Sequence, residues 1–207
     1  MMTLYVRKDG QFTPHVWEVG RGVPADAVWV DMESPTPEEL EMLQASVGID
    51  LPNREEEWKN QALNRMYSVG GVSDMMAALI TKVNSRHPNT QAVTFIVTEA
   101  CLITIRDLAP TSFANFARRL TSRARDFASG PEVLEGLMEE VITRVAYNSE
   151  LVVDELDDLS HTIFRLDELE DPDGNATLRM KDLLQRLGTA ADLNTKINES
   201  LHSLGRL

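Results

Sequence analysis

Two apolar stripes in the last third of the chain constrain the fold more than any other feature. The first runs from Val141 to Leu166 and the second from Met180 to Leu204, both in steps of three and four residues. This spacing places side chains on one face of an α-helix. The stripe residues are Val141, Val145, Asn148, Val152, Leu156, Leu159, Ile163 and Leu166, then Met180, Leu183, Leu187, Ala190, Asn194, Ile197, Leu201 and Leu204. Residues 171–176 (DPDGNA) end the first helix, which predicts an antiparallel helical hairpin with coiled-coil-like packing.

The first 130 residues show the shorter pattern of β-strands separated by turns. LYVRK and QFTPHVWEV flank Asp9-Gly10, a pair typical of a tight hairpin turn. Further strands are expected at 28–32 (VWVDM), 75–83 (MMAALITKV), 92–97 (AVTFIV) and 101–105 (CLITI), with the last two joined by the turn at 98–100. Gly70-Gly71 is typical of a turn or bulge.

Helices are expected between these strands. Thr36, Pro37 and Glu39 form a helix start with a capping box, and Gly48 ends that helix. Residues 53–67 (NREEEWKNQALNRMY) favour a second short helix, and residues 111–128 an amphipathic one. The predicted fold class is therefore α+β, a mixed sheet flanked by helices. We expect an α/β domain over 1–130 and the long helical hairpin over 131–207.

The charge of the chain limits its partners. A net charge of −13 repels phosphate backbones and anionic lipid headgroups, which argues against nucleic acid as a partner, and it attracts cations. Cys101 is the single cysteine, so no intrachain disulfide can form. The start of the chain lacks a signal-peptide profile, and no apolar run reaches the roughly 18 residues of a membrane span. These features predict a reduced, cytoplasmic, soluble domain.

Nothing in the sequence predicts an enzyme. It contains no HExxH, no phosphate-binding glycine loop and no GxSxG elbow. Cys101 opens an apolar strand with no histidine or basic residue beside it, as expected of a buried structural thiol. The four histidines are scattered along the chain.

The strongest candidate site is the acidic face of the first hairpin helix. Asp154, Asp157 and Asp158 form a cluster of like charges at helical spacing, and Glu150 lies on the same side, opposite the stripe. Divalent cations such as Mg²⁺ bind carboxylate oxygens. A solvated helix face is the simpler interpretation. One helix cannot encircle an ion, so a metal site here needs carboxylates from a neighbouring helix or subunit.

The order of these features resembles the cytoplasmic N-terminal part of CorA-type magnesium/cobalt transporters. The resemblance rests on four segments: VWVDMESPTPEELEMLQASVGIDLPNREEE (28–57), VTFIVTEACLITIRD (93–107), the helix from PEVLEGLMEEVITRV to DDLSHTIFR, and the closing DLNTKINESLHSLGRL. It extends over essentially all 207 residues. The family's Gly-Met-Asn motif, its two membrane helices and the stalk helix before them are absent. The resemblance therefore implies a fragment that ends before the stalk.

The resemblance implies a homopentamer in the cell inner membrane with cytoplasmic domains that sense Mg²⁺. Mg²⁺ bound between neighbouring subunits favours the closed state, and Co²⁺ and Ni²⁺ are further candidate cargoes. It also places regulatory carboxylates after the first helix, where Glu55, Glu56 and Glu57 stand. Lys59, within the family's acid-rich stretch, opposes a cation there.

Two alternatives remain open. One is a zinc-transporting relative of the same superfamily, which shares the fold and differs in the transported ion. The other is a soluble acidic module that binds a basic partner protein through the hairpin.

Overall fold

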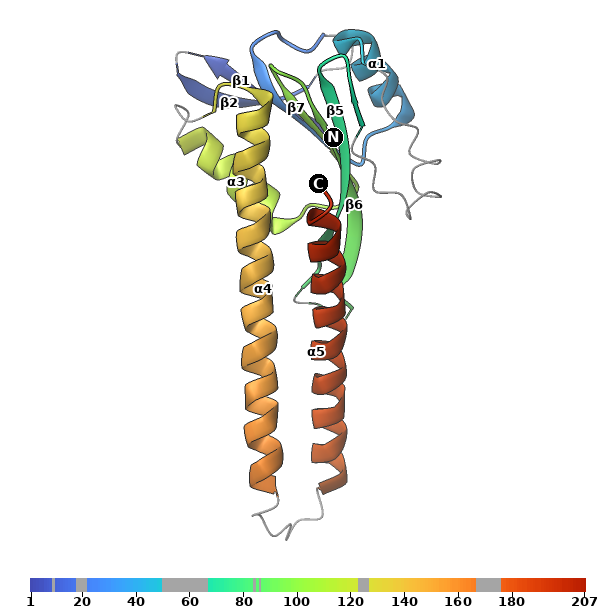
Figure 1. Ribbon diagram of the computed structural model, residues 1–207, viewed down its shortest axis with the longest axis vertical. Coiled ribbons are helices and arrows are strands. Elements are labelled where there is room, and N and C mark those ends of the chain that lie inside the picture. Colours follow the sequence, from blue (N-terminus) through green and yellow to red (C-terminus); the bar gives the residue numbers. More distant parts are fainter. Residues whose placement is uncertain are drawn as a thin grey trace.

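The computed structural model describes residues 1–8, 10–17, 22–49, 67–83, 85, 87–122, 127–166 and 176–207. These residues form a sheet of seven strands in the order β2-β1-β3-β7-β6-β5-β4, with long helices beside it (Figure 1). The strands are β1 (Met2–Lys8), β2 (Gln11–Val16), β3 (Ala27–Glu33), β4 (Tyr67–Val69), β5 (Val72–Thr81), β6 (Asn89–Val97) and β7 (Leu102–Arg106).

The sheet is mixed, as predicted. Strands β3 and β7 pair in parallel, with Asp31 opposite Thr104, and every other pairing among the described strands is antiparallel. The β4–β5 turn contains Gly70 and Gly71, both with positive φ (61° and 84°), which explains the paired glycines. The α+β fold class is therefore confirmed.

Helix α1 (Pro37–Val47) begins and ends where its local sequence predicts. The Glu39 amide donates to Thr36 Oγ1 at 3.2 Å, and the Thr36 amide donates to Glu39 Oε2 at 3.0 Å, which completes the capping box. Gly48 closes the helix in the left-handed conformation. Leu43 of this helix is buried against one face of the sheet, among Met2, Val30 and other apolar residues.

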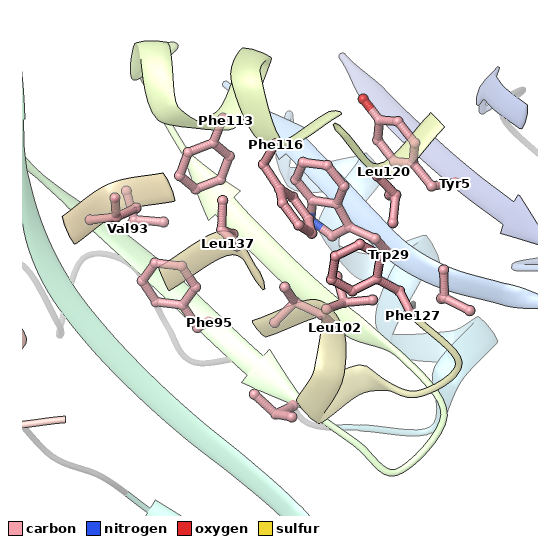
Figure 2. Packing of buried hydrophobic residues seen from close by; sticks show 14 of the residues in the cluster. Tyr5, Trp29, Val93, Phe95, Leu102, Phe113, Phe116, Leu120, Phe127 and Leu137 are labelled. Atoms are coloured by element: carbon pink, nitrogen blue, oxygen red, sulfur yellow. The ribbon is translucent and has the colours of Figure 1, made fainter. Parts of the chain in front are cut away.

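The opposite face of the sheet holds an aromatic core. Trp29 stacks on Tyr5 with ring centroids 4.5 Å apart and lies 5.3 Å from Phe116 of helix α3 (Thr111–Ser122). Figure 2 shows these rings converging between the strands and the helices, with Leu137 of helix α4 beside them. Burying so many rings removes a large apolar area from water, the main driving force for this layer.

The predicted hairpin is present. Helix α4 (Gly130–Leu166) runs away from the sheet, and helix α5 (Ala176–Leu204) returns antiparallel beside it (Figure 1). The described residues after Pro131 form no strand, as expected. The base of α4 shares the aromatic core through Val133, Leu137 and Val141. Because α4 contributes to the core of the first half, the two predicted domains share a core. The predicted domain boundary between residues 130 and 131 stays a prediction.

Only part of each predicted stripe is buried. The prediction of coiled-coil-like packing along the whole hairpin is therefore wrong. Buried stripe residues of α4 include Val145, Val152 and Leu159, and buried stripe residues of α5 are Leu183, Ala190 and Ile197. Leu204 is half-buried. Six other described stripe residues are exposed: Leu156, Ile163, Met180, Leu187, Asn194 and Leu201. Two helices side by side cover only a narrow strip of each other, so half of a wide apolar stripe stays in solvent.

The C-terminal half of α5 is also rotated relative to its predicted face. Ser200 and Ser203 are buried there, whereas Leu201 is exposed. The hydroxyl of Ser203 accepts a hydrogen bond from the Ala78 amide of β5 at 2.8 Å. The described part of β4 pairs with β5 only over Val72–Asp74, so α5 covers the rest of that strand edge. In this half, α5 therefore turns the small Ser200 and Ser203 toward the strand, and Leu201 toward solvent.

Candidate functional site on the helical hairpin

The predicted acidic face of α4 lies on the surface. Glu150, Asp154, Asp157 and Asp158 are all exposed, and the buried Val152 and Leu159 point away from them. The helix brings these carboxylates onto one side through its own periodicity. Within the described residues, no basic side chain forms an ion pair with Glu150, Asp154 or Asp157.

Asp158 differs from its neighbours because it is paired across the hairpin. Arg186 of α5 donates from Nη2 to Asp158 Oδ2 at 2.6 Å and from Nε to Glu155 Oε1 at 2.7 Å. The hydrogen bonds to Glu155 and Asp158 raise the pKa of the Arg186 guanidinium above its ordinary value. Arg186 was not predicted from the sequence, where it was only one basic residue on the facing helix.

The Arg186 contacts divide the acidic face into two parts. Glu155 and Asp158 already have a cation, whereas Glu150, Asp154 and Asp157 present unneutralised charge to solvent. A divalent ion approaching from outside therefore meets the second set first. We call Glu150, Asp154 and Asp157 the open acidic face.

A closed metal site does not form within the described part of this chain. There, no three histidine, cysteine, aspartate or glutamate side chains converge closely enough to hold a metal ion. The carboxylate oxygens of the open acidic face suit Mg²⁺ chemically, and the ion keeps most of its water ligands in such sites. Glu55, Glu56 and Glu57 lie outside the described residues, as does the short helix expected at 53–67 except for its last residue. That residue, Tyr67, begins strand β4, so the expected helix does not extend to it.

Cys101 behaves as a structural thiol. Burial raises the pKa of the Cys101 thiol to about 12, so it stays protonated near neutral pH. Its Sγ donates to the Leu102 carbonyl at 3.3 Å.

The order of strands, helices and hairpin matches a known protein family. The family model described as CorA-like Mg²⁺ transporter protein matches residues 24–204, which is most of the chain. This chain belongs to the CorA-like Mg²⁺ transporter family. The expected family is thus confirmed by a match that includes strands β3 to β7 and the hairpin.

CorA proteins of several bacteria are similar over two thirds or more of this chain. The magnesium transport protein CorA of Wolinella succinogenes is 21% identical over 97% of this chain and 61% of its own length. CorA of Haemophilus influenzae is 26% identical over 78% of this chain and 56% of its own length. The matches thus span 44–61% of the length of these CorA relatives.

Solved structures of a CorA transporter and of a ZntB domain share the fold. The complete CorA magnesium transporter of Methanocaldococcus jannaschii gives a TM-score of 0.58 at 12% identity, covering 98% of this chain and 72% of that one. The ZntB cytoplasmic domain of Vibrio parahaemolyticus gives 0.57 at 10% identity, covering 98% and 93%. Among the residues described here, no helix combines the length and apolar character needed to cross a membrane.

Proposed function

We propose that this chain is the cytoplasmic, cation-sensing part of a homopentameric Mg²⁺ transporter in the cell inner membrane. Membership of the CorA-like family supports transport of Mg²⁺, and Co²⁺ and Ni²⁺ are candidate cargoes of the same pore. The observation that supports sensing most directly is the open acidic face. It gathers carboxylates on the solvent side of the hairpin, where a neighbouring subunit can approach. The chain acts as a regulatory binding domain, not as an enzyme.

Electrostatics supplies the sensing mechanism. Five copies of a chain with a net charge of −13 repel one another when they are held side by side. A divalent cation between two copies offsets that repulsion and favours the associated state, whereas its loss lets the copies separate. A ligand that binds one of two states more tightly shifts the population toward it.

The ligand set for the ion comes from more than one subunit. The open acidic face supplies oxygens from one side only, since the described residues of one chain form no closed metal site. The second side is a carboxylate of the neighbouring copy, and Glu55, Glu56 and Glu57 are the candidates from the family resemblance. Water molecules fill the rest of the Mg²⁺ coordination shell.

Thermal unfolding tests cation binding by the isolated chain. We expect Mg²⁺ to raise the melting temperature beyond the effect of NaCl at equal ionic strength. At Mg²⁺ concentrations of 10–100 times Kd, the free energy of unfolding should increase by ~1–3 kcal/mol. The double variant Asp154→Asn/Asp157→Asn should lose most of this shift. The matched double variant Glu41→Gln/Glu135→Gln, at exposed positions elsewhere, should keep it.

Sedimentation velocity tests the intersubunit part. Mg²⁺ should increase the fraction of associated chain, and the Asp154→Asn/Asp157→Asn variant should not respond. If Mg²⁺ and matched NaCl act alike on both melting temperature and association, the open acidic face is a solvated helix surface and no sensor.

The transported ion requires the full-length transporter. Uptake by proteoliposomes, measured in turn for Mg²⁺, Co²⁺, Ni²⁺ and Zn²⁺, separates a magnesium transporter from a zinc-transporting relative. The likeness to the ZntB domain shows a shared fold only. We expect Mg²⁺ uptake, and uptake of Zn²⁺ alone would contradict the proposed cargo.

A further inference from the structure

A cavity lies between the end of β5, the start of α3 and the middle of α4. Its volume is about 340 Å³, at the lower end of the roughly 300–1,000 Å³ of small-molecule sites. The described lining residues are Ile80, Thr81, Lys82, Val83, Ser85, Ala109, Pro110, Thr111, Ser112, Arg144 and Asn148. None of these is acidic, although the chain has 33 aspartates and glutamates. The charged side chains of the described lining are therefore all basic, in an otherwise acidic protein.

Asn148 is the least satisfied side chain of this cavity. It is 0% exposed, yet neither its Oδ1 nor its Nδ2 has a hydrogen-bond partner among the described residues. A buried amide without partners is costly, and such groups in native structures call for a specific explanation. The stripe position of Asn148 would favour an apolar residue if packing were its only role. Its amide lines the cavity, where a bound molecule could satisfy it.

Two cationic side chains and a helix start accompany that amide. Arg144, one turn before Asn148 on α4, has a buried Nε without a partner among the described residues. Lys82 directly follows β5 on the other side of the cavity, with a positive φ of 55°. Thr111 and Ser112 are the first residues of α3, which has no acidic residue in its first turn. The free amides and the dipole of a helix start favour an anion.

We propose that this cavity binds a small phosphate-bearing anion, either inorganic phosphate or a phosphate monoester. Arg144 and Lys82 would neutralise its charge, the start of α3 would donate amide and hydroxyl hydrogen bonds, and the Asn148 Nδ2 would donate one more. A cation is disfavoured because the described lining has two basic side chains and no carboxylate. A purely apolar ligand is disfavoured because it would leave Asn148 and the Arg144 Nε unpaired. The inference is independent of the proposed Mg²⁺ sensing, which uses another part of α4.

Isothermal titration calorimetry with three probes tests the proposal. Inorganic phosphate, glycerol 3-phosphate and acetate are titrated in turn at constant ionic strength set with NaCl. We expect saturable binding of at least one phosphate probe and weaker binding of acetate. Tighter binding of glycerol 3-phosphate identifies a monoester site, and tighter binding of inorganic phosphate identifies a free-phosphate site. Binding of acetate alone, or of none of the three, overturns the proposal.

Two variants separate binding from packing. Arg144→Gln should weaken phosphate binding roughly tenfold or more, as expected for the loss of a charge-assisted hydrogen bond. Asn148→Leu should fold and match or exceed the wild-type melting temperature without phosphate, because it removes an unpartnered amide, yet bind phosphate more weakly. Arg179→Gln, at an exposed site near the start of α5, is the control for net charge and should bind normally.

Equal phosphate affinity in the wild type, Arg144→Gln and Asn148→Leu would overturn the assignment of this cavity. If Asn148→Leu fails to fold, the phosphate affinities of Arg144→Gln and of a Lys82→Gln variant still test the assignment. Lys82 is exposed at a turn, so its replacement tests the charge without disturbing the core.

Discussion

Arg106 of β7 holds both carboxylate oxygens of Asp31 on the parallel neighbour β3. Its Nε donates to Asp31 Oδ1 at 3.0 Å and its Nη2 donates to Oδ2 at 2.8 Å, with both side chains only 8% exposed. Thr104 donates to the same Oδ1 at 2.8 Å and accepts from Trp29 Nε1 at 3.0 Å. Burial alone would lower the pKa of Arg106, but the hydrogen bonds and charges of Asp31 and Glu33 raise it. The Arg106 guanidinium therefore stays charged in the core.

Removing one partner of this pair should be severe. We expect Asp31→Ala to lower the free energy of unfolding by about 3–5 kcal/mol, because the buried Arg106 guanidinium loses its bidentate partner. It keeps only the half-exposed Glu33 carboxylate and the Leu108 carbonyl. Urea denaturation measures the change. The double variant Asp31→Leu/Arg106→Met, which removes both charges, should recover much of the loss. A double variant less stable than Asp31→Ala would contradict this account.

Two glycines of the hairpin should respond in opposite directions to alanine. A Cβ at Gly136 would overlap the ring of Phe127 and come within 2.8 Å of the Phe116 ring. A Cβ at Gly188 meets nothing within 4 Å. We expect Gly136→Ala to destabilise by about 1–3 kcal/mol through overpacking, and Gly188→Ala to stabilise by about 0.5–1 kcal/mol through helix propensity. Chemical denaturation of both variants measures these changes in the free energy of unfolding. Equal changes in the two variants would refute the close contact of Gly136 with the rings of Phe116 and Phe127.

Replacing Arg186 tests the division of the acidic face. We expect Arg186→Gln to change the melting temperature little without divalent ions, since the contact lies at the surface, partly exposed, and surface ion pairs contribute little. It should increase stabilisation by Mg²⁺, because Glu155 and Asp158 are released to join the open acidic face. Arg179→Gln makes the same charge change elsewhere on α5 and should alter the Mg²⁺ response less. Equal responses in the two variants would count against a local cation site.

Asp74 on β5 should make stability depend on acid pH. Burial raises its pKa above the ordinary 3.8, although a hydrogen bond from the Met75 amide opposes this. The native state therefore binds the proton more tightly than the unfolded state, so this contribution to stability is present at low pH and is lost as pH rises through the native pKa. Asp74→Asn should be more stable than the wild type at pH 7, with a smaller difference at pH 4. Asp192→Asn, at an exposed site, should show no such pH-dependent gain.

Cys101 should react slowly while the chain is folded. With its pKa raised by burial to about 12, little thiolate exists near pH 8, and the half-buried side chain is only partly accessible. We expect labelling by iodoacetamide to be slow in buffer and rapid in concentrated urea, as followed by mass spectrometry. Rapid labelling of the native chain would place Cys101 in an open environment.

The sequence by itself determined the elements whose causes are local. The capping box of Thr36 and Glu39, the left-handed Gly48, the strands and the break between the two long helices each follow from residues a few positions apart. Hydrogen bonds within one turn and the periodicity of apolar side chains act over such short spans, so they could be predicted from neighbouring residues. The exposed acidic face of α4 followed from the same periodicity.

Only the tertiary structure decided which side of each helix is covered. The rotation of α5 that buries Ser200 and Ser203, the reach of Arg186 to Asp158, and the cavity around Asn148 all join residues far apart in sequence. A helical repeat fixes which side chains share a face but not which face meets a neighbour. A turn of about 100° separates adjacent residues on a helix, so a small rotation set by the β5 edge exchanges a buried position for an exposed one.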